Sequence, residues 1–357
     1  MLRRWWLAAA ALLAAGSAHA QGLAVKLDVE AARQVLAAVR DPRLTRERAL
    51  AIAKLPGNQG LIEKAHSYKK PADDALLAEA LLAAAQHRAS DADVYFHFAD
   101  VRDAADKIAP VIEALAAPGA LDPVRARIAQ FTPARVQASV TGYLVVGGTS
   151  GGFAFGDPQF YLNLARYPSA ALAKTILAHE LYHAVQAAAD AARPVSAEAK
   201  ACLAKIPASE DLGQLYWSLR AEGTASYVGD VLGLPADDPA AKPERERAQR
   251  GINLIARSVT LLGLSTHSLV SKGPVSYDDI YGLGFYGDEI LYSLGYVMTR
   301  AIAAEQGPGA VAELIDQPGA AMILRYAGLK AYGSKDAPAL DPETLDAAKR
   351  LMACYPG

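Results

Sequence analysis

Cysteine, long basic runs and long apolar runs are all scarce in this chain of 357 residues. Two cysteines exclude a small disulfide-rich scaffold, although Cys202 and Cys354 can either form one bridge to the C-terminal tail or remain buried free thiols. Lys and Arg number 36 against 38 Asp and Glu, and beyond residue 20 no basic run exceeds two residues, so we expect no nucleic-acid partner. Beyond residue 20 no apolar run is long enough to cross a bilayer, so we expect no membrane span there.

The N-terminus, by contrast, has the order of features found in a secretory signal peptide. Arg3 and Arg4 supply positive charge, residues 5–15 are mainly apolar, and Ala-His-Ala at residues 18–20 has the small-x-small pattern of a cleavage site. We therefore predict that residues 1–20 are a cleaved signal peptide and that the mature protein is periplasmic or secreted. The alternative is an uncleaved membrane anchor.

Two regions follow this segment. Residues 21–135 are rich in Ala and Leu at helical spacing, are interrupted by prolines, and predict a mainly helical N-terminal region. Over residues 136–146 apolar and polar side chains alternate at first, as in a half-buried strand. A glycine-rich turn over 147–152 leads to a second extended segment at 153–165. A small sheet is therefore predicted at the start of the second region, beside the helices.

The helical period returns after Pro168 and continues to the C-terminus. Ser169 is a suitable N-terminal cap, and Ser209, Glu210 and Asp211 supply acceptors and negative charge at the start of another helix. The predicted fold class is α+β and predominantly helical. Helices are expected over 169–191, 209–231, 242–262, 285–305, 308–316 and 341–353.

Residues 175–186 read Thr-Ile-Leu-Ala-His-Glu-Leu-Tyr-His-Ala-Val-Gln and lie inside the first of these helices. His179 and His183 are four residues apart, so they lie on one helix face and can bind one Zn²⁺ ion. Glu180 follows the first histidine, where it can accept a proton from water beside the metal. The alternative is a buried helix whose histidines are satisfied by hydrogen bonds alone.

A catalytic zinc site usually has three protein ligands and an open fourth position. Glu222 is the best candidate for the third ligand, because it lies within an apolar helix where an unpaired carboxylate is costly. Zinc would offset that cost, although an ion pair with Arg220 or with a lysine at the helix surface would also do so. Neither Cys nor His lies near Glu222 in the sequence to serve as a fourth ligand, which favours a catalytic site over a structural one.

This pattern resembles the gluzincin zinc metallopeptidases, because His-Glu-x-x-His at 179–183 is followed by Glu-Gly-x-Ala-x-Tyr at 222–227. It also resembles exported bacterial proteins described as zinc-dependent peptidases, over about residues 143–307. The resemblance implies a zincin-like (gluzincin) catalytic core within residues 136–357, and it supports Glu222 as the third ligand. The zinc aminopeptidases of that clan carry an acid before the zinc helix that binds the amine of the substrate, whereas residues 147–151 here carry none.

The same resemblance implies a later tyrosine that stabilises the oxyanion, and Tyr292 lies in the right order. Tyr292 also falls on an apolar helical stripe, so it could be an ordinary core aromatic. Three further tyrosines could then replace it, namely Tyr227, Tyr286 and Tyr296. Two residues after Glu222, Ser226 and Asp230, could support the histidines.

Together these residues predict a zinc-dependent hydrolase that cleaves peptide bonds in a peptide or protein substrate. His179, His183 and Glu222 would bind the metal, Glu180 would be the general base, and residues 159–164 could bind an extended peptide as an added strand. Two alternatives stay open. One is a non-catalytic, zinc-braced envelope scaffold or binding protein, and the other is a zinc hydrolase of cell-wall fragments.

Overall fold

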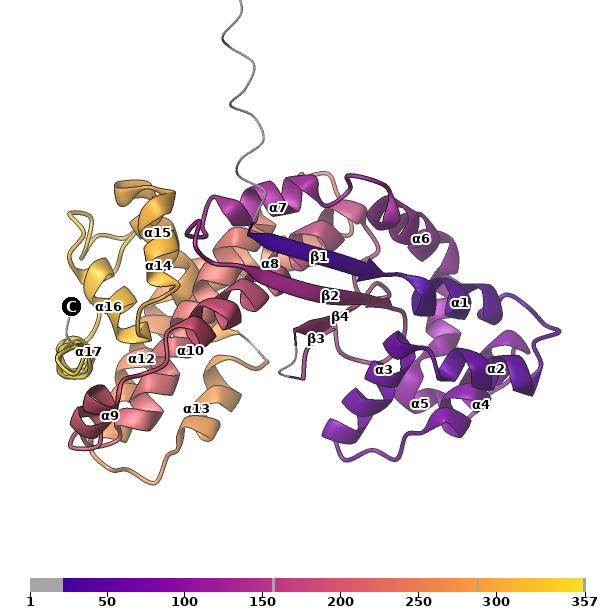
Figure 1. Cartoon of the computed structure of the whole chain (residues 1–357), viewed down its shortest axis with the longest axis horizontal. Coiled ribbons are helices and arrows are strands. Elements are labelled where there is room, and N and C mark those ends of the chain that lie inside the picture. Colours follow the sequence, from indigo (N-terminus) through magenta and orange to yellow (C-terminus); the bar gives the residue numbers. More distant parts are fainter. Residues whose placement is uncertain (1–21, 156–157, 288, 356–357) are drawn as a thin grey trace, which may run out of the picture.

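The computed structural model describes residues 22–155, 158–287 and 289–355. Within them the protein is predominantly helical, with a four-stranded mixed sheet between two groups of helices (Figure 1). The predicted α+β class is therefore confirmed, whereas the predicted signal peptide at residues 1–20 lies outside the described residues. In the described part, every helix is too short or too polar to span a membrane.

The sheet has the strand order β1-β2-β4-β3, so β1 and β3 lie at its edges. β1 pairs with β2 and β2 with β4 in parallel, whereas β3 runs antiparallel to β4. The sheet therefore has a parallel edge strand at β1 and an antiparallel edge strand at β3. The bounds are β1 (Leu23–Asp28), β2 (Ala138–Val145), β3 (Gly152–Phe153) and β4 (Gln159–Asn163).

The strand β1 was not predicted, because residues 21–135 were expected to be mainly helical. Leu23, Val25 and Leu27 alternate with the small or charged residues Ala24, Lys26 and Asp28, so the strand pattern was present but short. Its partner β2 begins over a hundred residues later, with Leu23 opposite Ala138. The rest of this region is helical, as predicted: α1 (Glu30–Val39), α2 (Arg46–Ala53), α3 (Pro56–Ser67), α4 (Asp74–Ala85), α5 (Asp93–Phe96), α6 (Phe98–Ala116) and α7 (Asp122–Ala129).

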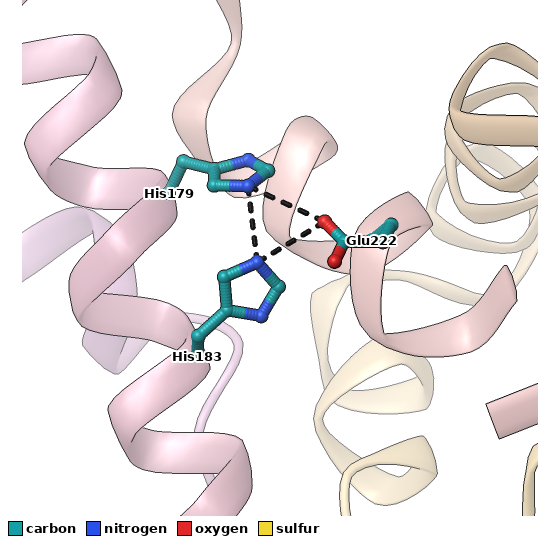
Figure 2. Close-up of side chains that lie close together, drawn as sticks. All are labelled: His179, His183 and Glu222. Atoms are coloured by element: carbon teal, nitrogen blue, oxygen red, sulfur yellow. Dashed lines mark hydrogen bonds and ion pairs between the residues drawn. The ribbon is translucent and has the colours of Figure 1, made fainter. Parts of the chain in front are cut away.

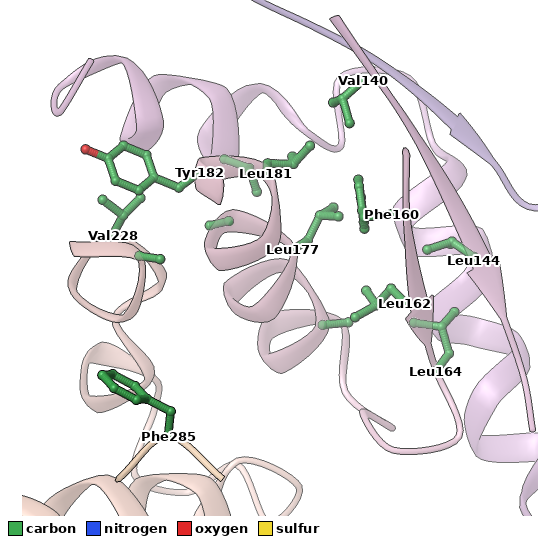
Figure 3. Close-up of a cluster of buried hydrophobic side chains, with 14 of the residues drawn as sticks. Val140, Leu144, Phe160, Leu162, Leu164, Leu177, Leu181, Tyr182, Val228 and Phe285 are labelled. Carbon is green, nitrogen blue, oxygen red and sulfur yellow. The ribbon is translucent and has the colours of Figure 1, made fainter. Parts of the chain in front are cut away.

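The helix α8 (Ala170–Ala192) packs on one face of the sheet (Figure 3). It begins where predicted, because the Ser169 hydroxyl accepts a hydrogen bond from the backbone N–H of Leu172. Leu177 and Leu181 are fully buried against side chains of β2 and β4, among them Leu144 and Leu162. This apolar face fixes the rotation of α8 against the sheet.

The C-terminal part is a group of helices around α10 (Ser209–Gly229), which contacts α8 on one side and α14 (Ile290–Gln306) on the other. The predicted helices are all present, but one predicted at 242–262 breaks at Leu254, and α14 begins five residues later than predicted. Unpredicted helices are α9, α13 and α16. The remaining bounds are α9 (Ala197–Leu203), η1 (Val231–Gly233), α11 (Lys242–Asn253), α12 (Ile255–Val270), α13 (Tyr277–Gly284), α15 (Pro308–Leu314), α16 (Gly319–Ala327) and α17 (Pro342–Met352).

Cys202 and Cys354 form a disulfide, with their Cα atoms 5.4 Å apart. The bridge joins α9 to the segment that follows α17, so it ties the C-terminal tail to the middle of the chain. Of the two alternatives that the sequence left open, the structure has the bridge and not the free thiols.

Candidate metal centre

His179 and His183 lie on one face of α8 and point at the facing helix α10, as Figure 2 shows. Their Nε2 atoms are 3.0 Å apart. Both side chains are partly exposed, with 18% of His179 and 28% of His183 accessible. The predicted histidine pair therefore converges at a position that solvent can still reach.

Glu222 is brought to this pair by α10. Its Oε2 atom lies 3.2 Å from Nε2 of His183 and 3.5 Å from Nε2 of His179 (Figure 2). Arg220, the alternative partner of this carboxylate, is buried elsewhere, where its guanidinium bonds backbone carbonyls near residue 315 and the Asp190 carboxylate. The cost of burying Glu222 is thus offset by the imidazoles and not by Arg220.

The three ligand atoms have the spacing that a tetrahedral zinc ion requires. Zinc binds imidazole nitrogen and carboxylate oxygen at about 2.0–2.1 Å, which puts any two tetrahedral ligands about 3.3 Å apart. The three separations here run from 3.0 to 3.5 Å. Among the described residues, His179, His183 and Glu222 form the group of His, Cys, Asp or Glu side chains that could share an ion. The donor set and its geometry therefore fit zinc.

Gln186 fixes the orientation of His183. The Gln186 amide nitrogen donates to the carbonyl of Ala221 and to the Thr224 hydroxyl, which leaves its oxygen to accept from Nδ1 of His183 at 2.8 Å. Nε2 is then the ring nitrogen that faces the site, as metal binding requires. Sequence reasoning named Ser226 and Asp230 for this support and missed Gln186. The signal was present, because Gln186 lies three residues after His183 on the same helix face.

Glu222 and His183 shift each other's pKa values. Burial disfavours a charged His183, but the Glu222 carboxylate outweighs it, both by its charge and by its hydrogen bond, and raises the pKa of His183 to about 9. Burial alone would raise the pKa of Glu222, yet the two imidazoles hold that pKa well below its usual range. Glu222 is therefore ionised at neutral pH, and a metal ion bound here would replace a proton on His183.

Glu180 lies beside the histidines and next to the edge strand β3. Gly152 makes room for it, because a Cβ atom at residue 152 would overlap the Glu180 carboxylate. The negative charge of Glu180 also contributes to the raised pKa of His183, and the side chain is partly exposed. The predicted general base is thus next to the candidate metal ligands, between α8 and the end of the sheet.

Tyr292 is brought to the site by a close crossing of α10 and α14. The backbones touch at Gly223 and Gly295, where a Cβ atom on either residue would overlap the other helix. The Tyr292 ring lies parallel to the His179 ring at a centroid distance of 6.3 Å. Burial, then the charge of Glu222 and a hydrogen bond to it, raise the pKa of Tyr292 well above its usual value, so the phenol stays protonated.

The other tyrosines differ in position. Tyr227 and Tyr296 pack against each other, with Arg127 over the Tyr227 ring and Arg300 over the Tyr296 ring, and Tyr286 is 66% exposed. Tyr281 on α13 was not predicted. Burial first, and then the Glu222 charge, raise its pKa, so this phenol also lies within the electrostatic reach of the site. Its helix was missing from the sequence-based prediction, which is why the residue was missed.

The strand expected to receive a peptide is not available for one. Residues 159–164 correspond to β4, which is paired with β2 on one side and with β3 on the other. Because β3 covers one edge of β4 at Tyr161 and Leu162 and β2 covers the other edge, β4 is an inner strand, so that prediction is wrong. The edge strand next to Glu180 is β3.

One of three comparisons with known proteins finds a match, and that match agrees with the chemistry of these residues. No curated protein and no solved structure matches the chain at a significant level. The family described as "Putative zinc dependent peptidase (DUF5700)" matches residues 51–329, a stretch that contains both ligand-bearing helices, β3 and Tyr292. This match covers more than half of the chain, and the chain therefore belongs to the DUF5700 family.

Proposed function

We propose that the protein is a zinc-dependent hydrolase of peptide bonds with a zincin-like, gluzincin-type site. His179, His183 and Glu222 bind the metal, and Glu180 is the general base. The observation that carries the proposal is the triangle of three ligand atoms at tetrahedral spacing, with a further carboxylate beside it. The family description supports the same reaction class.

Zinc bound at this triangle supplies a Lewis acid and makes water a usable nucleophile near neutral pH. Glu180 accepts the proton of the attacking water and passes it to the leaving amine. Tyr292, which stays protonated, donates its O–H to the oxygen on which negative charge develops. Gln186 keeps His183 in the tautomer that the reaction requires.

A peptide substrate would lie along β3. An extended chain can add to a free sheet edge through backbone hydrogen bonds, and β3 is the edge strand whose Gly152 lies against Glu180. Substrate bound there has its backbone beside both the general base and the metal ligands. We also propose that the protein is exported, which the signal-like N-terminus and the disulfide both support.

The rival functions differ in the number of ligands and in the need for Glu180. A structural zinc site normally has four protein ligands, whereas the ligand group in the described residues has three. A zinc-braced scaffold would also have no use for a carboxylate beside the ligands. A zinc hydrolase of cell-wall fragments would use the same site. Assays with peptides and with cell-wall fragments therefore distinguish it from a peptidase.

The test is metal analysis and peptide hydrolysis with matched isosteric variants. We expect Glu222→Gln to lose zinc, and Glu180→Gln to keep stoichiometric zinc but lose hydrolysis. Full zinc occupancy in Glu222→Gln would remove Glu222 from the ligand set. Undiminished hydrolysis in Glu180→Gln would remove the general base, and hydrolysis of cell-wall fragments in place of peptides would favour the alternative substrate.

A further inference from the structure

The helix α3 lies on the face of the sheet opposite to α8, and it crosses β2, β4 and β3 in that order. Gly57 lies against Val145 of β2, and a Cβ atom at Gly60 would overlap the Tyr161 ring of β4. One turn later, Nζ of Lys64 lies 5.7 Å from the ring centroid of Phe153 in β3. Because these positions follow one another on one helix face, the C-terminal end of α3 lies at the β3 edge of the sheet.

A cluster of aromatic and basic side chains gathers at this end, and we call it the lysine patch. Nζ of Lys64 lies 4.9 Å from the ring centroid of Tyr68, and Nζ of Lys70 lies 5.9 Å from the same centroid. The Tyr68 hydroxyl is 3.1 Å from the Ser150 hydroxyl, in the loop that leads into β3. The patch consists of Lys64, Tyr68, Lys70, Ser150 and Phe153.

The patch has an excess of positive charge. Within the described ranges, neither Lys64 nor Lys70 forms an ion pair with a carboxylate, although both are only partly exposed. Burial alone would raise the pKa of Tyr68, but its hydrogen bonds with Ser150 and Lys64 and the charges of the two lysines lower it below its usual value. Both ammonium groups therefore lie beside the same phenol ring without a carboxylate of the described residues to neutralise them.

The loop beside the patch is held in place by one buried amide. Asn163 donates to the carbonyls of Gly147 and Ser150, and its side-chain oxygen accepts from the backbone N–H of Gly147 and of Ala165. Asn163 itself is fully buried. Ser150 and the start of β3 are therefore fixed relative to the sheet, and the patch has a defined position at its edge.

The two residues of β3 face opposite sides. Gly152 faces Glu180, whereas Phe153 faces Lys64, since successive residues of a strand alternate. In a peptide added along β3, the residue opposite Phe153 points its side chain to the face on which Phe153 and Lys64 lie. Its neighbour in the peptide is opposite Gly152, next to the general base. A group recognised by the patch is therefore close to the bond that is cleaved.

We propose that the lysine patch binds a carboxylate of the peptide substrate, so that the enzyme prefers substrates with a negative charge next to the cleaved bond. The inference rests on the proposed function. The carboxylate comes either from an Asp or Glu side chain or from the C-terminus of the peptide. Two ammonium groups without a carboxylate partner in the described part of the chain repel a free amine, which agrees with the lack of an acid in residues 147–151.

The test uses zinc-loaded full-length protein and internally quenched peptides that differ only by Glu, Gln or Lys at one scanned position. Each peptide is made with a free and with an amidated C-terminus. We expect kcat/KM to be roughly two- to fivefold higher for Glu than for Gln at one position, the size of an exposed ion pair. A preference for the free over the amidated terminus would instead identify the terminal carboxylate as the source.

The variants are Lys64→Met and Lys64→Glu, with Lys70→Gln as a second site and Lys54→Met as the matched control. Lys54 is an exposed lysine at the end of α2, away from the patch. We expect Lys64→Met and Lys70→Gln to bring the Glu-to-Gln ratio towards one, Lys64→Glu to favour the Lys peptide, and the control to keep the wild-type ratio. Wild-type protein that ignores charge at every position and at the terminus would overturn the proposal, as would the same ratio in Lys64→Met and Lys54→Met.

Failure of the proposed function has a different signature. In that case zinc binds, but none of the peptides is hydrolysed. Fluorescence anisotropy of labelled forms of the same peptides with zinc-loaded Glu180→Gln protein then tests the patch alone. Tighter binding of the Glu or free-terminus peptide, lost in Lys64→Met, supports the carboxylate site, and equal binding of all peptides rejects it.

Discussion

Gln186 is a buried side chain with little freedom. Only 2% of it is accessible, and each of its polar atoms has a partner: the His183 ring, the Ala221 carbonyl or the Thr224 hydroxyl. It therefore connects the ligand-bearing turn of α8 to the turn of α10 that carries Glu222. In the proposed zinc site, Gln186 would act on the metal through the histidine that it orients.

Replacing Gln186 with Leu should weaken zinc binding by about ten- to a hundredfold, because His183 then loses the acceptor that fixes its tautomer. The measurement is the zinc dissociation constant, obtained by competition with a chelator of known affinity. Thr224→Val removes one hydrogen bond to the Gln186 amide but leaves the acceptor on His183, so it should weaken binding less. Equal affinities for wild type and Gln186→Leu would show that the orientation of His183 does not depend on this amide.

Replacing Tyr292 with Phe should leave zinc content unchanged and lower kcat by about a hundredfold, the effect of removing one oxyanion donor. The ring stays in place beside His179, so the change removes the hydroxyl alone. Steady-state kinetics with one peptide, together with metal analysis, checks this. Tyr281→Phe is the comparison, and a larger loss in that variant would assign the donor to α13.

The residues of the candidate site could largely be placed from the sequence, because their spacing obeys helix geometry. His179, Glu180 and His183 lie within one turn, and Glu222 was identified from the cost of a carboxylate in an apolar helix. Tyr281 could not be predicted in the same way. Its place near Glu222 depends on how α13 folds back onto α10, which no local pattern records.

At the level of helices and strands, the crossing of α10 and α14 determines where the phenol lies. Gly223 directly follows Glu222, and Gly295 lies three residues after Tyr292, so the closest approach of the two helices is next to the site. At this distance between the two helices, only glycine fits at residues 223 and 295. Glu222, the proposed third ligand, and Gly223, the contact between the two helices, are thus adjacent in the chain.

Gly223→Ala should destabilise the protein by about 1–3 kcal/mol, because the added methyl group forces α10 and α14 apart. It should also lower kcat by moving Tyr292. Gly213→Ala, on the same helix but with no atom within 4 Å of the added Cβ, should instead stabilise by about 0.5–1 kcal/mol. Urea unfolding of both variants measures the difference, and equal stabilities would contradict the packing described here.

The long helix α8 was predicted well, and β2 and β4 lie within the predicted extended segments, whereas β1 and α13 were not predicted. The helix α8 matched its predicted bounds to within one residue, because an apolar stripe and a serine cap both act locally. β1 depends on a partner that begins at Ala138, and α13 has eight residues and three polar positions in its first turn or cap. The gluzincin-type core and the division at residue 135 stay predictions.

At the scale of the whole molecule, the disulfide closes a loop of 152 residues that contains most of the C-terminal helices. Replacing both Cys202 and Cys354 with Ser should lower the free energy of unfolding by about 2–5 kcal/mol, since the unfolded chain regains the freedom that the bridge removes. Zinc content should be unchanged, because the ligands lie on α8 and α10 and not at the bridge. Calorimetry of the double variant beside dithiothreitol-treated wild type checks this, and identical melting temperatures for the variant and oxidised wild type would contradict it.

The bridge also decides what happens when a protease nicks the exposed segment between α12 and α13. Such a cut separates the chain into one piece with His179, His183 and Glu222 and another with Tyr292. Cys202 belongs to the first piece and Cys354 to the second, so the two halves remain covalently attached. A nicked molecule therefore keeps the three proposed ligands and Tyr292 together, and the cut becomes visible on a gel only after the disulfide is reduced.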